Sequence, residues 1–362
     1  MIREASPNLP PERHLASDNN AGVLPEVLAR LAEVNTGHTA GYGHDPYTAH
    51  VIQRVVDAFG GKGAAALFFT GTAANVVAAG VCLQRYEAVV CGQQSHLYVD
   101  EGGAPERWLG CKLMPLPTDL GRIRPESVEQ VLRLRGDEHN VLPKVLTLTQ
   151  PTELGVCYRP DELAELCRLA HQRGLYVHVD GARLANASAF LGCSWAELTT
   201  DLGVDLVSLG GTKNGLMGAE ALVVLRPGLT GNLLRFQKQA MQLASKMRFV
   251  AAQFDAWLDG DLWLHTARRA NAMAQQLGAW VDAFGPPLER VAPVEANGVF
   301  VRIPAHWYAP LNEHIRFYIW EEQPEHQAVV VRWMCSFDTQ EADLARLQQA
   351  VVQLAQPEAA VQ

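Results

Sequence analysis

The chain has 362 residues, of which 48% are hydrophobic and 19% charged, and 39 acidic against 30 basic residues give a net charge of -9. This ordinary globular composition excludes disordered, collagen-like and coiled-coil proteins. With no basic stretch, nucleic acid and anionic membranes are poor partners, and no apolar run approaches the roughly 18 residues of a membrane-spanning helix. The N-terminus has no hydrophobic signal core and the seven cysteines form no Cys-x-x-Cys pair. We therefore predict a cytoplasmic protein with no metal site and no disulfide framework.

The first part of the chain predicts an arm followed by two helices. Prolines and charges near the N-terminus indicate a flexible arm over residues 1–16. The segment PEVLARLAEVN has apolar residues at helical spacing and a proline suited to a first helical turn. A polar, glycine-rich loop, TGHTAGYGHDPYT, leads to a second amphipathic helix, AHVIQRVVDAFG.

The middle of the chain alternates between two patterns. Helix-patterned stretches such as DELAELCRLAHQRG separate short apolar runs, which are AALFFT, EAVVC, KVLTLTQ, LYVHVD, DLVSLG and ALVVL. Fully apolar strands that alternate with helices predict an α/β fold with a mostly parallel sheet covered by helices on both faces. We assign this large domain to residues 17–255.

The C-terminal part predicts a smaller α/β domain, residues 256–362. Long helices are expected over residues 229–290, followed by strands at VEANGVFVRI, IRFYIW and QAVVVRWMCSF. A capping box formed by Asp338 and Glu341 is expected to begin the final helix, ADLARLQQAVVQLA.

Ligands of such sheets bind beyond the carboxyl ends of the strands, and the end of LFFT is one candidate. Gly71 and Thr72 follow it and open a helix of small residues. The free N–H groups and positive dipole end of a helix N-terminus suit a phosphate, although a plain tight turn gives the same pattern. No G-x-G-x-x-G motif or Walker lysine is present here, so a nucleotide-dependent oxidoreductase is not indicated.

Two further strand ends carry charged groups. Asp180 ends LYVHVD, where a buried carboxylate needs a cation or a donor, although it could also cap the next helix and leave Arg183 on the surface. His178 lies on the same face of the strand as Asp180 and is predicted to be a core histidine.

Lys213 follows DLVSLG on a Gly-Gly turn. Partial burial there would lower its pKa, as imine formation requires. The alternative is a solvated loop lysine. A phosphate loop, a strand-end aspartate and a later strand-end lysine together fit pyridoxal phosphate.

Several segments resemble the threonine aldolase family of fold-type-I pyridoxal-phosphate enzymes. They are SDNNAGVLPEVLARLAEVNTGHTAGYGHDPYT, FFTGTAANVVAAG, SHLYVDEGGAPE, HVDGARLANASAFLG, SLGGTKNGLMGAEALVVL and VRWMCSFDT. The resemblance runs from about Ser17 to about Val351 and is greatest to the bacterial low-specificity L-threonine aldolases and L-phenylserine aldolases. It implies a fold-type-I large domain with a smaller C-terminal domain.

The resemblance assigns roles around the cofactor. Lys213 would bind pyridoxal 5'-phosphate covalently, and Asp180 would hold its pyridine nitrogen protonated. His96 would stack on the ring near the substrate β-hydroxyl and is the first choice for the catalytic base; without the family it would be taken for a loop residue. Gly71 and Thr72 would bind the phosphate.

The same resemblance assigns more distant roles. Arg248, otherwise expected on a solvated helix face, would reach the cofactor phosphate of a neighbouring subunit, with help from Lys238. Ser17, Arg183 and Arg332 would grip the substrate α-carboxylate, for which a guanidinium offers paired donors.

The implied activity is retro-aldol cleavage of L-threonine, L-allo-threonine and L-phenylserine to glycine and an aldehyde, by a homotetramer with shared active sites. Two departures from the family pattern affect the expected substrate preference: Thr152 stands in place of a family histidine, and His44 in place of an aspartate.

The alternatives to this activity are β-elimination or transamination on the same cofactor, and a non-catalytic domain that senses pyridoxal phosphate. The last usually needs a DNA-binding partner domain, for which no basic segment exists.

Overall fold

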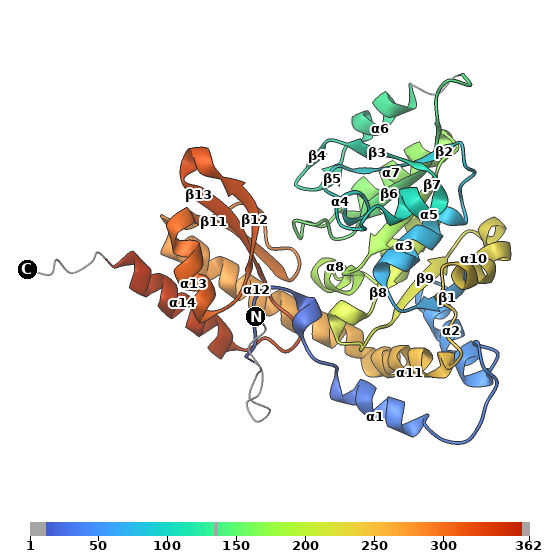
Figure 1. Ribbon diagram of the computed structural model, residues 1–362, viewed down its shortest axis with the longest axis horizontal. Helices are drawn as coiled ribbons and strands as arrows, with labels where there is room; N and C mark the ends of the chain where they lie inside the picture. Colours follow the sequence, from blue (N-terminus) through green and yellow to red (C-terminus); the bar gives the residue numbers. More distant parts are fainter. Residues whose placement is uncertain (1–11, 134–136, 357–362) are drawn as a thin grey trace, which may run out of the picture.

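The computed structural model describes residues 12–133 and 137–356. A large unit and a smaller unit lie side by side and are joined by the long helix α12, Leu262–Phe284 (Figure 1). Most of the predicted N-terminal arm, residues 1–11, lies outside the described residues. Within the described ranges, no helix combines the length and apolarity needed to span a bilayer.

The large unit is built on a seven-stranded sheet in the order β1-β9-β8-β7-β6-β2-β3. Strand β9 is antiparallel to both of its neighbours, and the other strands run in one direction, which confirms the predicted mostly parallel α/β sheet. The strands are β1 (Ala64–Phe68), β2 (Glu87–Gly92), β3 (Lys112–Leu116), β6 (Leu142–Thr149), β7 (Tyr176–Gly181), β8 (Leu206–Gly210) and β9 (Glu220–Val224).

Helices cover both faces of this sheet. Successive strand residues point to opposite faces, so Ala65 and Leu67 pack in one hydrophobic cluster while Ala66 and Phe68 pack in another. The first cluster contains residues of α1 (Pro25–Glu33), α2 (Pro46–Ala58), α6 (Pro125–Leu132), α7 (Pro160–Gln172), α8 (Leu184–Leu191), α9 (Trp195–Leu198) and α11 (Met247–Leu258). The second contains residues of α3 (Gly71–Gly80), α4 (His96–Val99), α5 (Ala104–Leu109) and α10 (Leu233–Gln239).

The smaller unit is a four-stranded antiparallel sheet in the order β10-β11-β13-β12 with its own hydrophobic cluster. Leu15 belongs to this cluster, and its backbone bonds to Arg316 and Met334. Helix α12 contributes Ala267 to the large unit's cluster and Ala274 to this one; the predicted domain limits stay a prediction. The elements are β10 (Glu289–Arg290), β11 (Gly298–Pro304), β12 (Tyr318–Gln323), β13 (Ala328–Met334), α13 (Tyr308–His314) and α14 (Glu341–Ala355).

Short elements complete the chain. Strands β4 (Thr118–Asp119) and β5 (Arg122–Ile123) form a two-stranded hairpin. The 3₁₀ segments are η1 (Asp18–Asn20), η2 (Thr200–Leu202), η3 (Thr212–Asn214), η4 (Pro227–Asn232), η5 (Asp259–Asp261), η6 (Ala305–Trp307) and η7 (Pro324–His326).

The predicted capping box of the final helix is wrong by two residues. Helix α14 is capped by Gln340, whose reciprocal partner is Asp343. Asp338 instead accepts a hydrogen bond from the Ser336 hydroxyl, and the Ser336 N–H donates to Thr339. Asp338 is therefore used in a turn that precedes the helix.

Candidate active site

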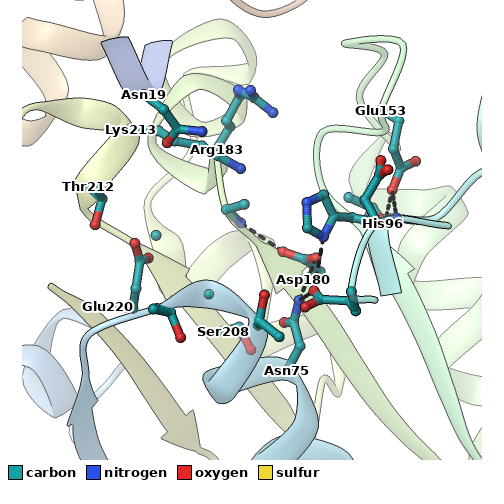
Figure 2. Close-up of a pocket in the computed structure, with 18 of the residues that line it drawn as sticks. Asn19, Asn75, His96, Glu153, Asp180, Arg183, Ser208, Thr212, Lys213 and Glu220 are labelled. Carbon is teal, nitrogen blue, oxygen red and sulfur yellow. Dashed lines mark hydrogen bonds and ion pairs between the residues drawn. The ribbon is translucent and has the colours of Figure 1, made fainter. Parts of the chain in front are cut away.

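A pocket of about 470 Å³ opens where β1, β6, β7 and β8 end (Figure 2). These strands run in the same direction, so their carboxyl ends meet at one edge of the sheet. The smaller unit closes part of the pocket with Trp320 of β12 and Arg332 of β13. The pocket brings together all the predicted site residues except Arg248, namely Ser17, Gly71, Thr72, His96, Asp180, Arg183, Lys213 and Arg332.

Lys213 enters the pocket from η3, directly after β8. A Cβ on Gly210 would collide with the backbone of Ala182, so glycine there permits the close approach of β8 to the turn after β7. Burial lowers the pKa of Lys213, and the nearby Arg183 charge lowers it further. A lowered pKa increases the fraction of neutral amine, which is the nucleophilic form.

Asp180 lies near the end of β7 and is only 3% exposed. Its Oδ1 accepts a hydrogen bond of 3.0 Å from the Ala182 N–H, and its Oδ2 accepts one of 2.9 Å from the side-chain amide of Asn75. These two donors fix the orientation of the carboxylate and compensate part of its burial.

His96, at the start of α4, forms a pair with Glu101. Nδ1 of His96 lies 2.9 Å from Oε1 of Glu101, which also accepts a 3.1 Å hydrogen bond from Asn75. The hydrogen bond to Glu101 raises the pKa of His96, against the opposing effect of burial. Because Nδ1 is engaged, Nε2 is the ring nitrogen left to contact a ligand (Figure 2).

The N-terminus of α3 forms another side of the pocket. Thr70 caps the helix through the Ala73 N–H, and Gly71 and Thr72 carry the first N–H groups, which have no acceptor within the helix. A Cβ on Gly71 would meet nothing within 4 Å. Glu220 also lines the pocket, and burial raises its pKa to about 7, so near neutral pH a large share of it is uncharged.

Arg332 has an incomplete set of hydrogen-bond acceptors. One of its terminal nitrogens donates to Ala16 O at 3.1 Å, while its buried Nε has no partner within the described residues. The guanidinium lies 5.7 Å from the centre of the Trp320 ring and 5.9 Å from that of Tyr318. A buried donor without an acceptor is rare in folded proteins, and a ligand carboxylate would complete it.

Arg183 already binds a carboxylate of the protein. Its Nε and one terminal nitrogen donate to the two oxygens of buried Asp18, at 2.6 and 2.9 Å. Burial opposes ionisation of Asp18, but the charge and hydrogen bond of Arg183 outweigh it and lower the pKa. Ser17 accepts the Asn19 N–H in the same turn. The roles of Ser17 and Arg183 in binding the substrate stay predictions.

Arg248 and Lys238 lie outside this pocket. Arg248, in the first turn of α11, donates to Thr36 O at 3.0 Å, and the Lys238 ammonium lies 5.1 Å from the centre of the Tyr42 ring. Their predicted role concerns the phosphate of a neighbouring subunit, and it stays a prediction.

His178 is a buried core histidine, as expected. It is 0% exposed, and its ring nitrogens lie 3.3 Å from the Thr147 hydroxyl and 2.9 Å from that of Ser208. Burial lowers its pKa to about 4, so it is neutral at ordinary pH.

The sequence interpretation missed several polar residues of this region, among them Asp18, Asn75, Glu101, Glu153 and Glu220. Glu153 lies just beyond the end of β6 and lines the pocket, so the rule that selected Asp180 and Lys213 could have found it. Asp18 and Asn75 act through partners 165 and 105 residues away, and no local pattern reveals such pairs.

Pyridoxal phosphate fits the donors that this pocket offers. Lys213, whose pKa is lowered, lines the same pocket as Asp180, whose carboxylate is held in place by hydrogen bonds. The N-terminus of α3, with its free N–H groups, lines this pocket as well. These groups match the aldehyde, the pyridine nitrogen and the phosphate of the cofactor. The fold and the pocket define a fold-type-I pyridoxal-phosphate enzyme.

Comparisons with known proteins show to which family of these enzymes the chain belongs. The chain belongs to the beta-eliminating lyase family, whose sequence model matches residues 14–304. It is 41% identical over 328 residues to the low specificity L-threonine aldolase of Pseudomonas aeruginosa, covering 90% of this chain and 93% of that one. A low specificity L-threonine aldolase of Pseudomonas sp. is 40% identical over 336 residues, which cover 92% and 96% of the two chains. Among solved structures, the Leishmania major threonine aldolase superposes with a TM-score of 0.89 at 28% identity, covering 94% of this chain and 98% of that chain.

Proposed function

We propose that this enzyme cleaves L-β-hydroxy-α-amino acids between Cα and Cβ, giving glycine and an aldehyde. The observation that carries this proposal is the convergence of Lys213, Asp180 and the partly unsatisfied Arg332 on one pocket. The names of the two Pseudomonas relatives, which align over nearly their whole length, agree with it. L-Threonine, L-allo-threonine and L-phenylserine are the proposed substrates.

Each side of the pocket has one task in this reaction. When bound, the cofactor supplies an electron-accepting ring for the electron pair that Cα–Cβ cleavage leaves on Cα. Lys213 would hold the cofactor through its amine, and Asp180 would keep the pyridine nitrogen protonated. Arg332, with Ser17 and Arg183, holds the α-carboxylate and so fixes which bond of Cα can break.

His96 is proposed to contact the β-hydroxyl through Nε2. Its Nδ1 contact with Glu101 fixes the ring orientation and favours the protonated imidazole. A protonated imidazole donates a hydrogen bond to an oxygen and holds it in place. The choice of His96 as the catalytic base stays a prediction.

We propose strict L selectivity at Cα and loose selectivity at Cβ. The Thr152 hydroxyl donates to Leu120 O at 2.9 Å and accepts the Val156 N–H at 3.2 Å. Because these backbone groups occupy it, it exerts little control over a substrate hydroxyl. L-Phenylserine should be cleaved at least as efficiently as L-threonine, because its ring gains apolar burial and its product aldehyde is conjugated.

β-Elimination is the second candidate, since the matching family model is that of the beta-eliminating lyases. The two reactions give different products from L-threonine. Purified enzyme loaded with cofactor should give glycine and acetaldehyde, detected by chromatography and an aldehyde reagent. Ammonia and a keto acid in equal amounts would assign the second reaction instead.

We propose a homotetramer with shared active sites that resides in the cytoplasm. Apolar side chains stand exposed near the pocket side of the large unit, among them Phe69 at 43% and Met241 at 82%, and association would cover them. All seven cysteines are free thiols, and six of them are buried, which suits a reducing compartment. Light scattering in solution tests the assembly, and cell fractionation tests the compartment.

A further inference from the structure

Glu153 is a carboxyl group in the pocket that the proposed mechanism does not yet use. It lies in the loop after β6, lines the pocket beside His96 and Asp180, and is visible next to His96 in Figure 2. Its Oε1 accepts hydrogen bonds of 2.8 Å from the Thr149 hydroxyl and 3.0 Å from the His96 backbone N–H. Neither bond uses Oε2.

These two hydrogen bonds tie Glu153 to the residue that is proposed to hold the β-hydroxyl. The backbone of His96 is held by Glu153, and its ring is held by the Nδ1 contact with Glu101, so the carboxyl group and the imidazole lie in defined positions in the pocket wall. The Thr149 hydroxyl comes from the last residue of β6, which anchors the carboxyl group to the rigid sheet. Two donors hold Oε1 in this way and leave Oε2 for a substrate proton, so the carboxyl group is suited to proton transfer in a defined geometry.

The surroundings of Glu153 favour a carboxyl group that changes protonation state near neutral pH. Burial raises the pKa of Glu153 to about 7, against its hydrogen bonds to Thr149 and His96. Asp180 raises it as well. Other titratable groups that interact with it electrostatically include Arg183 at the start of α8, Cys91 of β2 and Tyr158 in the loop before α7.

His96 has the opposite character. Glu101 raises its pKa, so the imidazole is held protonated to higher pH than an isolated histidine. A protonated imidazole cannot accept a proton, whereas an ionised carboxylate with a near-neutral pKa can accept one and later return it. These properties suit His96 to donating a hydrogen bond and Glu153 to accepting a proton.

We propose that Glu153, in place of His96, is the general base that takes the β-hydroxyl proton during cleavage; this inference rests on the proposed aldol activity. The O–H bond breaks and its proton passes to the Glu153 carboxylate, while the electron pair of that bond forms the second bond of the aldehyde carbonyl. The Cα–Cβ bond breaks, and its electron pair remains on the amino-acid fragment. Cα takes up a proton that comes from water by a route that does not use Glu153, which completes glycine. Glu153 releases the β-hydroxyl proton to water before the next cycle.

The test compares Glu153→Gln with wild type in two reactions. Gln keeps an oxygen for the Thr149 and His96 donors but cannot act as a base. We expect kcat for L-threonine cleavage to fall about 100-fold or more, the usual contribution of a general base. Exchange of the glycine α-hydrogen with D₂O, which involves no β-hydroxyl, should stay within about twofold of wild type, since that proton transfer does not use Glu153. Glu165→Gln, on the exposed side of α7, is the matched control and should change neither reaction.

The pH profile provides an independent readout. Wild-type kcat/KM should rise with pH through about 7, as Glu153 ionises, and this acidic limb should disappear in Glu153→Gln. If Glu153→Gln does not fold, Glu153→Asp replaces it, and it should keep the limb with a lower kcat. Loss of the limb in Glu153→Asp would overturn the proposal.

The remaining outcomes separate this inference from the proposed function. A Glu153→Gln enzyme that cleaves L-threonine within threefold of wild type and keeps the limb would overturn the role of Glu153 alone. Equal loss of cleavage and of glycine exchange would show a structural role and overturn it too. A cofactor-loaded wild type that forms no glycine from any β-hydroxy amino acid would overturn the proposed function together with this inference.

Discussion

The side-chain amide of Asn75, on α3, donates a 2.9 Å hydrogen bond to Oδ2 of Asp180, at the end of β7. The same nitrogen donates to Oε1 of Glu101 at 3.1 Å. Asn75 thus links the carboxylate proposed to hold the cofactor nitrogen with the carboxylate that orients His96. One amide keeps two buried carboxyl groups in fixed positions without adding a charge of its own.

Replacement of Asn75 tests this linkage. Asn75→Leu keeps the size of the side chain but leaves both carboxylates without that donor, and unsatisfied buried acceptors cost about 1–3 kcal/mol. We expect the free energy of unfolding in urea to fall by about 2 kcal/mol and cofactor binding to weaken. Asn75→Asp, which adds a third buried carboxylate, should be worse in both measurements. Full stability of both variants would show that the linkage has no energetic importance.

Asp180→Asn should separate cofactor binding from turnover. An amide cannot hold the pyridine nitrogen protonated, so the ring would accept electrons poorly. Its single oxygen can accept a hydrogen bond from the Ala182 N–H or from the Asn75 amide, which bind different oxygens of Asp180. In fully cofactor-loaded protein we expect kcat for L-threonine to fall at least about 100-fold, in the range of losses seen when one charge-stabilising group is removed. Turnover within a few-fold of wild type would rule out the electron-sink role of Asp180.

The His96–Glu101 pair predicts a specific titration. The hydrogen bond to Glu101 raises the pKa of His96, so the C2–H resonance of His96 should titrate above its ordinary value of about 6.5. In Glu101→Gln the midpoint should fall, because burial then acts without the opposing carboxylate. By linkage, the stability that the pair contributes is fully present below the unfolded pKa of His96 and is lost as pH rises through the raised folded pKa. An unchanged midpoint in Glu101→Gln would contradict the assignment.

Arg332→Lys should affect substrate binding before chemistry. Lysine keeps the positive charge but loses the paired donors that match a carboxylate. We expect KM for L-threonine to rise about tenfold or more, with the absorbance spectrum of the bound cofactor unchanged. An unaltered KM would exclude Arg332 from the substrate-binding site.

Cβ selectivity can be checked with the two threonine diastereomers. Because the Thr152 hydroxyl is occupied by Leu120 O and the Val156 N–H, kcat/KM for L-threonine and L-allo-threonine should differ by far less than 1000-fold. A larger preference, about 4 kcal/mol in transition-state binding, would show that another group controls the configuration at Cβ.

Local patterns in the sequence were sufficient for the sheet and for the strand-end residues. Asp180 and Lys213 could be selected because each follows an apolar strand, and parallel strands bring such positions to one edge. Arg332 and Ser17 come from segments remote in sequence, and only the family resemblance pointed to them.

The residues that hold the pocket side chains in place could not be predicted, because their contacts join distant segments of the chain. Asp18 belongs to the site because Arg183, far along the chain, donates a hydrogen bond to it. Asn75 belongs to it because α3 packs beside β7 and brings the amide to Asp180. The predicted capping box of α14 was wrong for a related reason. Asp338 accepts a hydrogen bond from Ser336, and the residue spacing of a capping box does not take such a competing partner into account.

The most direct measurement of the central claim is to map the lysine that binds the cofactor. Borohydride reduction of the cofactor-loaded enzyme, followed by digestion and mass spectrometry, should place the pyridoxyl label on Lys213, and Lys213→Ala should lose the label, the absorbance of the bound cofactor and nearly all cleavage of L-threonine. A label on Lys238, Lys246 or any other lysine, or a fully active Lys213→Ala enzyme, would contradict the placement of the active site in this pocket.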